Sequence, residues 1–163
     1  MHPWVVPLRE ILQLNTALFD HCLEGVDDAL ARKKMDAKTN SMLFIAVHLL
    51  DARFYMAESL GLAVNDPLKD RFQEFQNEAD LLRTPPHLVQ ILGAWEVIAP
   101  HLERRFDELT ERELKLELPG KFPVDDPTLL GGMAFLAQHE SYHIGQLAIL
   151  RRLHGLEAMC YQR

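Results

Sequence analysis

Residues 129–155 read LLGGMAFLAQHESYHIGQLAILRRLHG and give the clearest indication of the fold class. Its apolar side chains recur at spacings of three and four residues, which is the period of one face of an α-helix. Pro127 stands just before the stretch and Gly155 closes it, the usual order of these two residues around a helix. We therefore expect a long helix that ends at about His154, with His139 and His143 one turn apart on its inward face.

Three other long stretches show the same helical period. They run from Leu8 to Leu30, from Ser41 to Leu60, and from the residue after Pro86 to Leu109. Pro100 interrupts the last stretch and should kink or split that helix, because proline cannot donate a backbone hydrogen bond. We expect a shorter helix from Pro67 to Leu82 and an extended connection from Glu111 to Val124. Together these elements predict an all-α four-helix bundle with long crossover connections, in one domain that spans residues 1–163.

The composition excludes several classes of protein. The chain of 163 residues has a formal net charge of −7, whereas a nucleic-acid-binding face needs clustered lysine and arginine. Its apolar runs are far shorter than the roughly 20 residues that span a bilayer, so we expect no membrane insertion. Two cysteines, Cys22 and Cys160, do not make a disulfide framework and are expected to be reduced thiols of a cytoplasmic protein.

Histidines in two of the expected helices point to a metal site. His139 and His143 stack on one face of the last helix, and His48 follows an apolar run in the second helix, which favours an inward direction. Three neutral imidazoles suit a divalent transition metal and leave coordination positions open for water or substrate. From spacing alone, a metal site and three ordinary core histidines remain equal alternatives.

Other polar side chains are weaker candidates for a role at this site. Asp51 and Tyr55 share a helix face with His48, and Gln146 lies one turn beyond His143. Each is also compatible with an ordinary polar helix shoulder. Glu140 completes the letters H-E-x-x-H of zinc peptidases, but the residues that extend that motif are missing and no strands precede the helix. A peptidase is therefore a poor interpretation.

The chain resembles the DinB-like family, also called the DinB/YfiT superfamily. The resemblance rests on HESYHIGQLAILRRLHG at residues 139–155 and on AVHLLDARF at residues 46–54, in the right order on the right helices. Arg53 stands near a position where the family often has an acidic residue. The resemblance implies an up-down-down-up bundle, often a homodimer, and places His48, His139 and His143 as ligands of zinc or nickel. Some relatives are S-transferases or isomerases that use low-molecular-weight thiols.

Three functional hypotheses follow. The first is a metal-dependent S-transferase that brings a low-molecular-weight thiol to a small electrophilic molecule, with Tyr55 or Tyr142 steering the product. The second is a metal-dependent hydrolase with Glu140 or Asp51 as the base, because a bound metal ion acidifies water. The third is a bundle in which the metal only braces the fold or supports binding of a partner, without catalysis.

Overall fold

The structure, a computed structural model, describes residues 1–69, 77–119 and 122–161. Its elements are all helical over these residues, and an isolated bridge between Glu117 and Thr128 is the one β-type pairing found among them. The elements are η1 (Pro3–Val5), α1 (Val6–Leu23), α2 (Asp28–Arg32), α3 (Met42–Ser59), α5 (Glu78–Leu81), α6 (Leu88–Glu108), α7 (Glu111–Leu114) and α8 (Leu129–Leu153). The predicted all-α fold class is therefore confirmed.

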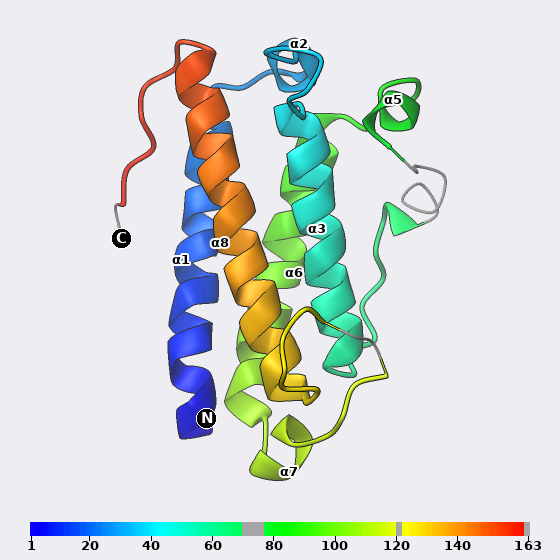
Figure 1. The fold of residues 1–163 in the computed structure, drawn as a ribbon, viewed down its shortest axis with the longest axis vertical. Helices are drawn as coiled ribbons and strands as arrows, with labels where there is room; N and C mark the ends of the chain where they lie inside the picture. Colours follow the sequence, from blue (N-terminus) through cyan, green and yellow to red (C-terminus); the bar gives the residue numbers. More distant parts are fainter. Residues whose placement is uncertain (70–76, 120–121, 162–163) are drawn as a thin grey trace.

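Four long helices form the body of the molecule. In Figure 1, α1 and α8 rise side by side, whereas α3 and α6 descend. Helix α3 packs against both α6 and α8, which are its neighbours among the long helices. The core between the helices is apolar, and Phe19 of α1 stacks on Trp95 of α6 with ring centroids 4.0 Å apart. Among the described residues, no helix combines the length and apolarity needed to cross a membrane.

Capping residues set the ends of the helices that carry the histidines. The Ser41 hydroxyl accepts a hydrogen bond from the Phe44 N–H and begins α3, while the Thr128 hydroxyl does the same for Gly131 at the start of α8. Gly61 and Gly155 follow the two helices with φ of 74° and 82°, the left-handed conformation that glycine adopts freely. These ends agree with the predicted ones to within about two residues.

The first predicted helix is too long. The chain leaves α1 at Leu23 and turns at Gly25, where φ is 74°. A separate short helix, α2, then begins at Asp28, because the Asp27 carboxylate accepts a hydrogen bond from the Leu30 N–H. The prediction that one helix runs from Leu8 to Leu30 is wrong because glycine and an N-cap aspartate outweigh the continued apolar spacing.

Helix α6 and the segment after it differ from their predicted structure. Helix α6 runs without a break through Pro100, so the helix is not split; its buried face, from Trp95 to Phe106, packs along the core on both sides of the proline. Residues Glu111–Leu114, expected to be extended, form α7. For the helix predicted from Pro67 to Leu82, residues 70–76 lie outside the described part of the chain, and α5 occupies its far end.

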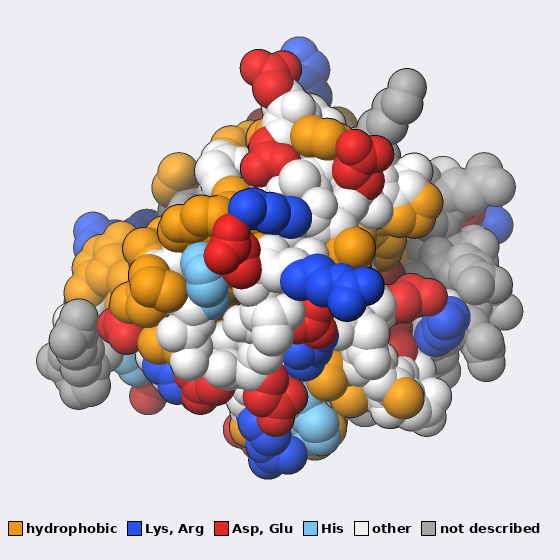
Figure 2. Space-filling model, turned by 90° about the horizontal axis from the view of Figure 1, so that it is seen from below, with side chains coloured by type: hydrophobic (Ala, Val, Ile, Leu, Met, Phe, Trp, Pro, Cys, Tyr) orange, Lys and Arg blue, Asp and Glu red, His pale blue; other side chains and the backbone are white. Residues whose placement is uncertain are grey.

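The surface at one end of the bundle is mixed in character. Figure 2, seen from below, shows acidic and basic side chains interspersed there, with apolar side chains gathered toward one edge. On the face in view, charge of one sign therefore does not collect into a continuous field of the kind that attracts nucleic acid.

Candidate metal centre

Helix α8 places two of the predicted ligands on one face. His139 and His143 are four residues apart, so their rings stack one turn above the other, with centroids 4.5 Å apart. Both side chains are half-buried. The pair faces α3, because both rings lie against His48 of that helix.

Helix α3 supplies the third ring. The ring centroid of His48 lies 4.8 Å from that of His139 and 4.7 Å from that of His143. The two Nε2 atoms of His48 and His139 are 2.9 Å apart. One nitrogen from each of the three residues lies within 4.8 Å of the others. The structure thus brings together the three histidines that the sequence singled out from eight.

The surroundings keep the rings of His48 and His139 in the form that binds metal. Burial lowers the pKa of His139 to about 4, and the neighbouring charges of His143 and His48 act in the same direction. Burial, followed by the charge of His143, also lowers the pKa of His48. At neutral pH both imidazoles therefore keep a free lone pair, as a metal ligand must.

The spacing of the nitrogens fits a transition-metal ion. Zinc–nitrogen bonds of about 2.0–2.1 Å at tetrahedral angles put ligand nitrogens roughly 3.3 Å apart. The distance of 2.9 Å between His48 Nε2 and His139 Nε2 and the 4.8 Å limit for the whole group bracket that value. With three protein ligands, a four-coordinate ion keeps one position for an exogenous group. His48, His139 and His143 could therefore hold an ion that also binds a small molecule.

Two side chains on α8 adjoin His143. Oε1 of Gln146 lies 2.6 Å from Nδ1 of His143, and the Gln146 amide donates to the Tyr142 hydroxyl at 3.2 Å. Tyr142 is 58% exposed, so it lies at the outer edge of the histidine cluster. The sequence named Gln146 as a candidate on helical spacing alone, and the structure puts it in contact with a predicted ligand.

Asp51 and Tyr55 line a hollow one and two turns along α3 from His48. The hollow has a volume of about 270 Å³ and is bounded by Asp51, Phe54, Tyr55, Glu58, Leu62, Val64, Asn65, Asp66 and Lys69. Loss of hydration raises the pKa of Asp51, and the negative charge of Asp66 adds to the effect. The carboxyl group of Asp51 therefore holds its proton more tightly than a free aspartate does.

An aromatic series connects this hollow with the histidines. Tyr55 lies 6.0 Å from Phe122, Phe122 lies 5.3 Å from Phe135, and Phe135 lies 5.7 Å from His139, measured between ring centroids. Phe122 comes from the connection between α7 and α8, so that connection helps to form the wall of the site. The sequence did not single out either phenylalanine, because aromatic residues at such positions are usually ordinary core.

Glu140 does not belong to the histidine cluster but is paired with Arg53 in the core. Its carboxylate is 2% exposed, and both of its oxygens accept hydrogen bonds from Arg53 at 2.8 Å. A carboxylate with both oxygens engaged by a buried guanidinium is not available to take a proton from water. The structure therefore removes Glu140 from the candidate bases, and the letters H-E-x-x-H do not indicate a peptidase here.

Comparison with known proteins is consistent with this geometry. A search of curated proteins gave no match. A family model described as the DinB superfamily matches residues 11–147, which include the whole of α3 and α6 and all three histidines. Because that match covers most of the chain, the resemblance seen in the sequence is confirmed, and this protein belongs to the DinB superfamily.

Proposed function

We propose that this chain binds one divalent metal ion, zinc or nickel, and is a metal-dependent S-transferase that uses a low-molecular-weight thiol. The observation that carries the proposal is the meeting of His48, His139 and His143 across α3 and α8. Three neutral nitrogen donors with an open position are typical of catalytic sites, whereas structural zinc sites are usually closed by four protein ligands.

The bound ion would lower the pKa of a thiol that reaches it, so that the sulfur reacts as thiolate. In the net reaction the thiol sulfur becomes bonded to an electrophilic carbon. The leaving group departs with its bonding electrons, and the thiol proton passes to it or to solvent. Phe122 and Phe135 offer an apolar wall for a small electrophile. Tyr55, which is 42% exposed, is our candidate for donating a proton to the product.

Asp51 supports a second candidate, metal-assisted hydrolysis. It lies one turn from His48 on α3 and lines the hollow, and its raised pKa brings it closer to the range of an effective general base. The Asp51→Asn variant separates the two reactions: it should abolish hydrolysis but leave thiol transfer largely intact.

Elemental analysis of untagged protein tests the metal site itself. We expect close to one zinc or nickel ion per chain, lost in both His48→Ala and His143→Ala. His101→Ala is the matched control, since His101 lies on α6 with its Nδ1 at 2.9 Å from the Val97 carbonyl oxygen. If the native protein takes up neither metal after incubation with each, the proposal fails and the three rings are ordinary core histidines.

Cobalt substitution tests the thiol. Addition of 2-mercaptoethanol or cysteine to the cobalt-loaded protein should change its visible absorption spectrum, because sulfur replaces another ligand. An unchanged spectrum would exclude the thiol route. Strong thermal stabilisation by metal without binding of any small molecule would instead favour the third hypothesis, in which the ion only braces the bundle.

We further propose that the chain forms a homodimer in the cytoplasm. Tyr142, Ile149 and Leu153 of α8 are 58%, 62% and 56% exposed, an apolar stripe at helical spacing that supports self-association. Cys22 and Cys160 are both free, as expected in a reducing compartment. Light scattering coupled to size exclusion would measure the mass, and a monomer at micromolar concentration would contradict the dimer.

A further inference from the structure

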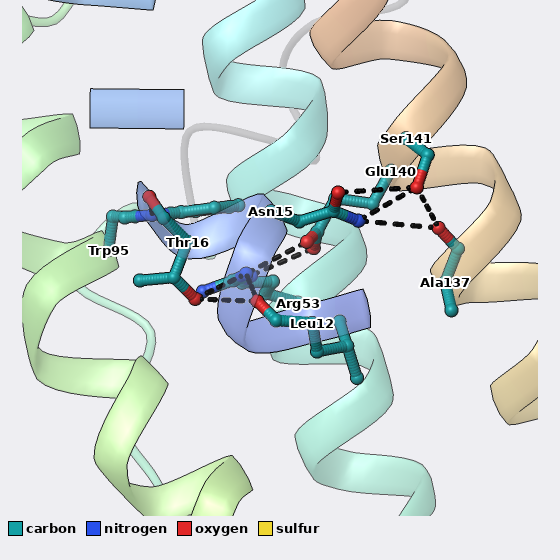
Figure 3. A network of polar contacts seen from close by, with 8 residues as sticks. All are labelled: Leu12, Asn15, Thr16, Arg53, Trp95, Ala137, Glu140 and Ser141. Atoms are coloured by element: carbon teal, nitrogen blue, oxygen red, sulfur yellow. Dashed lines mark hydrogen bonds and ion pairs between the residues drawn. The ribbon is translucent and has the colours of Figure 1, made fainter. Parts of the chain in front are cut away.

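A buried ion pair joins the two helices that carry the histidines. Arg53 of α3 and Glu140 of α8 are 1% and 2% exposed. The guanidinium donates through Nε and Nη2 to the two carboxylate oxygens, each at 2.8 Å, so the contact is a two-pronged fork (Figure 3). Such a fork fixes both the distance and the orientation of its partners.

The remaining contacts of Arg53 involve the other two long helices. Its Nη2 also donates to the Thr16 hydroxyl at 2.9 Å and to the Leu12 carbonyl oxygen at 3.3 Å, both on α1. Its guanidinium carbon lies 3.4 Å from the ring centroid of Trp95 on α6. Figure 3 shows the guanidinium at the point where these groups converge. All four long helices thus meet at one side chain.

Stability alone does not account for this arrangement. Removing two charges from water costs free energy that their attraction often only offsets, and apolar residues of similar volume can hold a core as well. The surrounding core is otherwise largely apolar, and aliphatic side chains such as leucine, isoleucine and methionine pack without strong directional preference. A forked ion pair does prefer one direction, and one established use of buried polar groups is to fix the register of helices.

The ion pair and the metal site depend on the same register between α3 and α8. Glu140 follows His139 directly, and Arg53 lies five residues after His48. Each residue adds about 1.5 Å of rise and about 100° of turn to a helix, so a slip of α8 by one residue would break the fork and swing His139 away from His48. A second contact favours the same rotation: the Asn15 amide of α1 donates to the Ser141 hydroxyl at 3.0 Å.

We propose that Arg53 and Glu140 are positioning residues, which hold α8 in the rotation that brings His139 against His48. This inference rests on the proposed metal binding, because the metal site is what the positioning would serve. The positioning itself is a property of the protein without metal. Neither residue touches the site; each acts through the helix that it holds.

The double variant Arg53→Met/Glu140→Leu tests the proposal. It replaces the pair by apolar side chains of similar length, so the bundle should still fold, with a thermal midpoint close to that of the native protein. We expect its zinc affinity, measured by competition with a chromophoric chelator, to fall about tenfold or more, as when groups that orient metal ligands are removed. The cobalt absorption spectrum should change as well. Affinity and spectrum equal to those of the native protein would overturn the proposal.

The matched control removes an ion pair elsewhere. Arg105 of α6 donates to Glu113 of α7 at 2.5 Å, and neither residue lies on α3 or α8. The Nε of Arg105 also donates to the Leu60 carbonyl oxygen at the C-terminal end of α3, about three turns beyond His48. The variant Arg105→Met/Glu113→Leu should alter stability but leave zinc affinity unchanged. If the test variant does not fold, Arg53→Lys carries the same test, because lysine keeps the charge and loses the fork.

A measurement without metal separates this inference from the proposed function. In metal-free protein, nuclear Overhauser contacts between the ring protons of His48 and His139 should be present in the native chain and the control, and lost in the test variant. Should the native protein bind neither zinc nor nickel, the metal proposal fails while these ring contacts still decide the positioning role. Contacts that persist in the test variant would refute it.

Discussion

Nδ1 of His143 lies 2.6 Å from Oε1 of Gln146, one turn further along α8. An amide oxygen only accepts hydrogen bonds, so in the neutral ring Nδ1 carries the proton and Nε2 has the free lone pair. The Gln146 amide nitrogen donates in turn to the Tyr142 hydroxyl, which holds the amide in this orientation. Gln146 therefore selects the tautomer of His143 that can bind a metal ion through Nε2.

Gln146→Leu should weaken zinc binding by about 10- to 100-fold, because the variant keeps the bulk of the side chain and loses the acceptor. Competition with a chromophoric chelator measures the change. Gln138→Leu is the control, since Gln138 is an exposed residue of the same helix. Equal affinity in the Gln146→Leu variant and the native protein would show that the contact does not matter for metal binding.

Gly131→Ala should lower the free energy of unfolding by roughly 1–3 kcal/mol. A Cβ atom at Gly131 would collide with the backbone carbonyl oxygen of Asp126, so the connection that carries Phe122 would have to move. Gly93→Ala is the opposite case: nothing lies within 4 Å of its added Cβ, and we expect a gain of about 0.5–1 kcal/mol. Urea unfolding of both variants checks this, and a neutral Gly131→Ala would contradict the close approach.

Glu113 makes stability depend on acid pH. The Thr110 hydroxyl, followed by the Arg105 guanidinium, holds the pKa of Glu113 at about 2, below its ordinary value of 4.5. Because the folded pKa is lowered, the contribution is full above pH 4.5 and is lost as the pH falls toward 2. Glu113→Gln should therefore lose less stability than the native protein between those two values.

Urea unfolding at intervals across this pH range would measure the difference. Glu10→Gln, at an exposed position of α1, provides the control and should follow the native profile. Parallel profiles for the native protein and Glu113→Gln would mean that the caps of α7 do not set the pKa of Glu113.

The two thiols should differ sharply in reactivity. Burial raises the pKa of Cys22 to about 11, and its side chain is 0% exposed, whereas Cys160 is exposed. Iodoacetamide reacts with thiolate, so at pH 8 the native protein should be alkylated at Cys160 and spared at Cys22. Peptide mass spectrometry distinguishes the two sites. Both should react in guanidinium, and alkylation of Cys22 at a comparable rate in the native state would contradict its burial.

The sequence predicted the long helices well because their ends carry their own signals. Ser41 and Thr128 are N-caps, and Gly61 and Gly155 supply the left-handed turn that stops a helix. Helix α7 was missed although Thr110 and Glu113 form a capping box, a signal that the alternating leucines of this segment obscured. A capping box of this kind predicts the start of a helix at Thr110.

The candidate site could be predicted only as far as helical spacing reaches. His139 and His143 share a face by their separation, and His48 was placed by the apolar run before it. The partner of Arg53 could not be found in this way, since a pairing between residues 87 positions apart depends on how the helices pack. For the same reason Glu140 remained a candidate base until the fold placed its carboxylate on Arg53.

The separation of His48 from His139 by 91 residues also has a consequence for the timing of assembly. At roughly 5–20 residues per second, a ribosome would expose His48 about 5–20 s before His139. During that interval the nascent chain offers a single imidazole from the trio, which cannot retain an ion. Metal loading would therefore be one of the last events in the making of this protein, after α8 has left the ribosome and docked between α1 and α3.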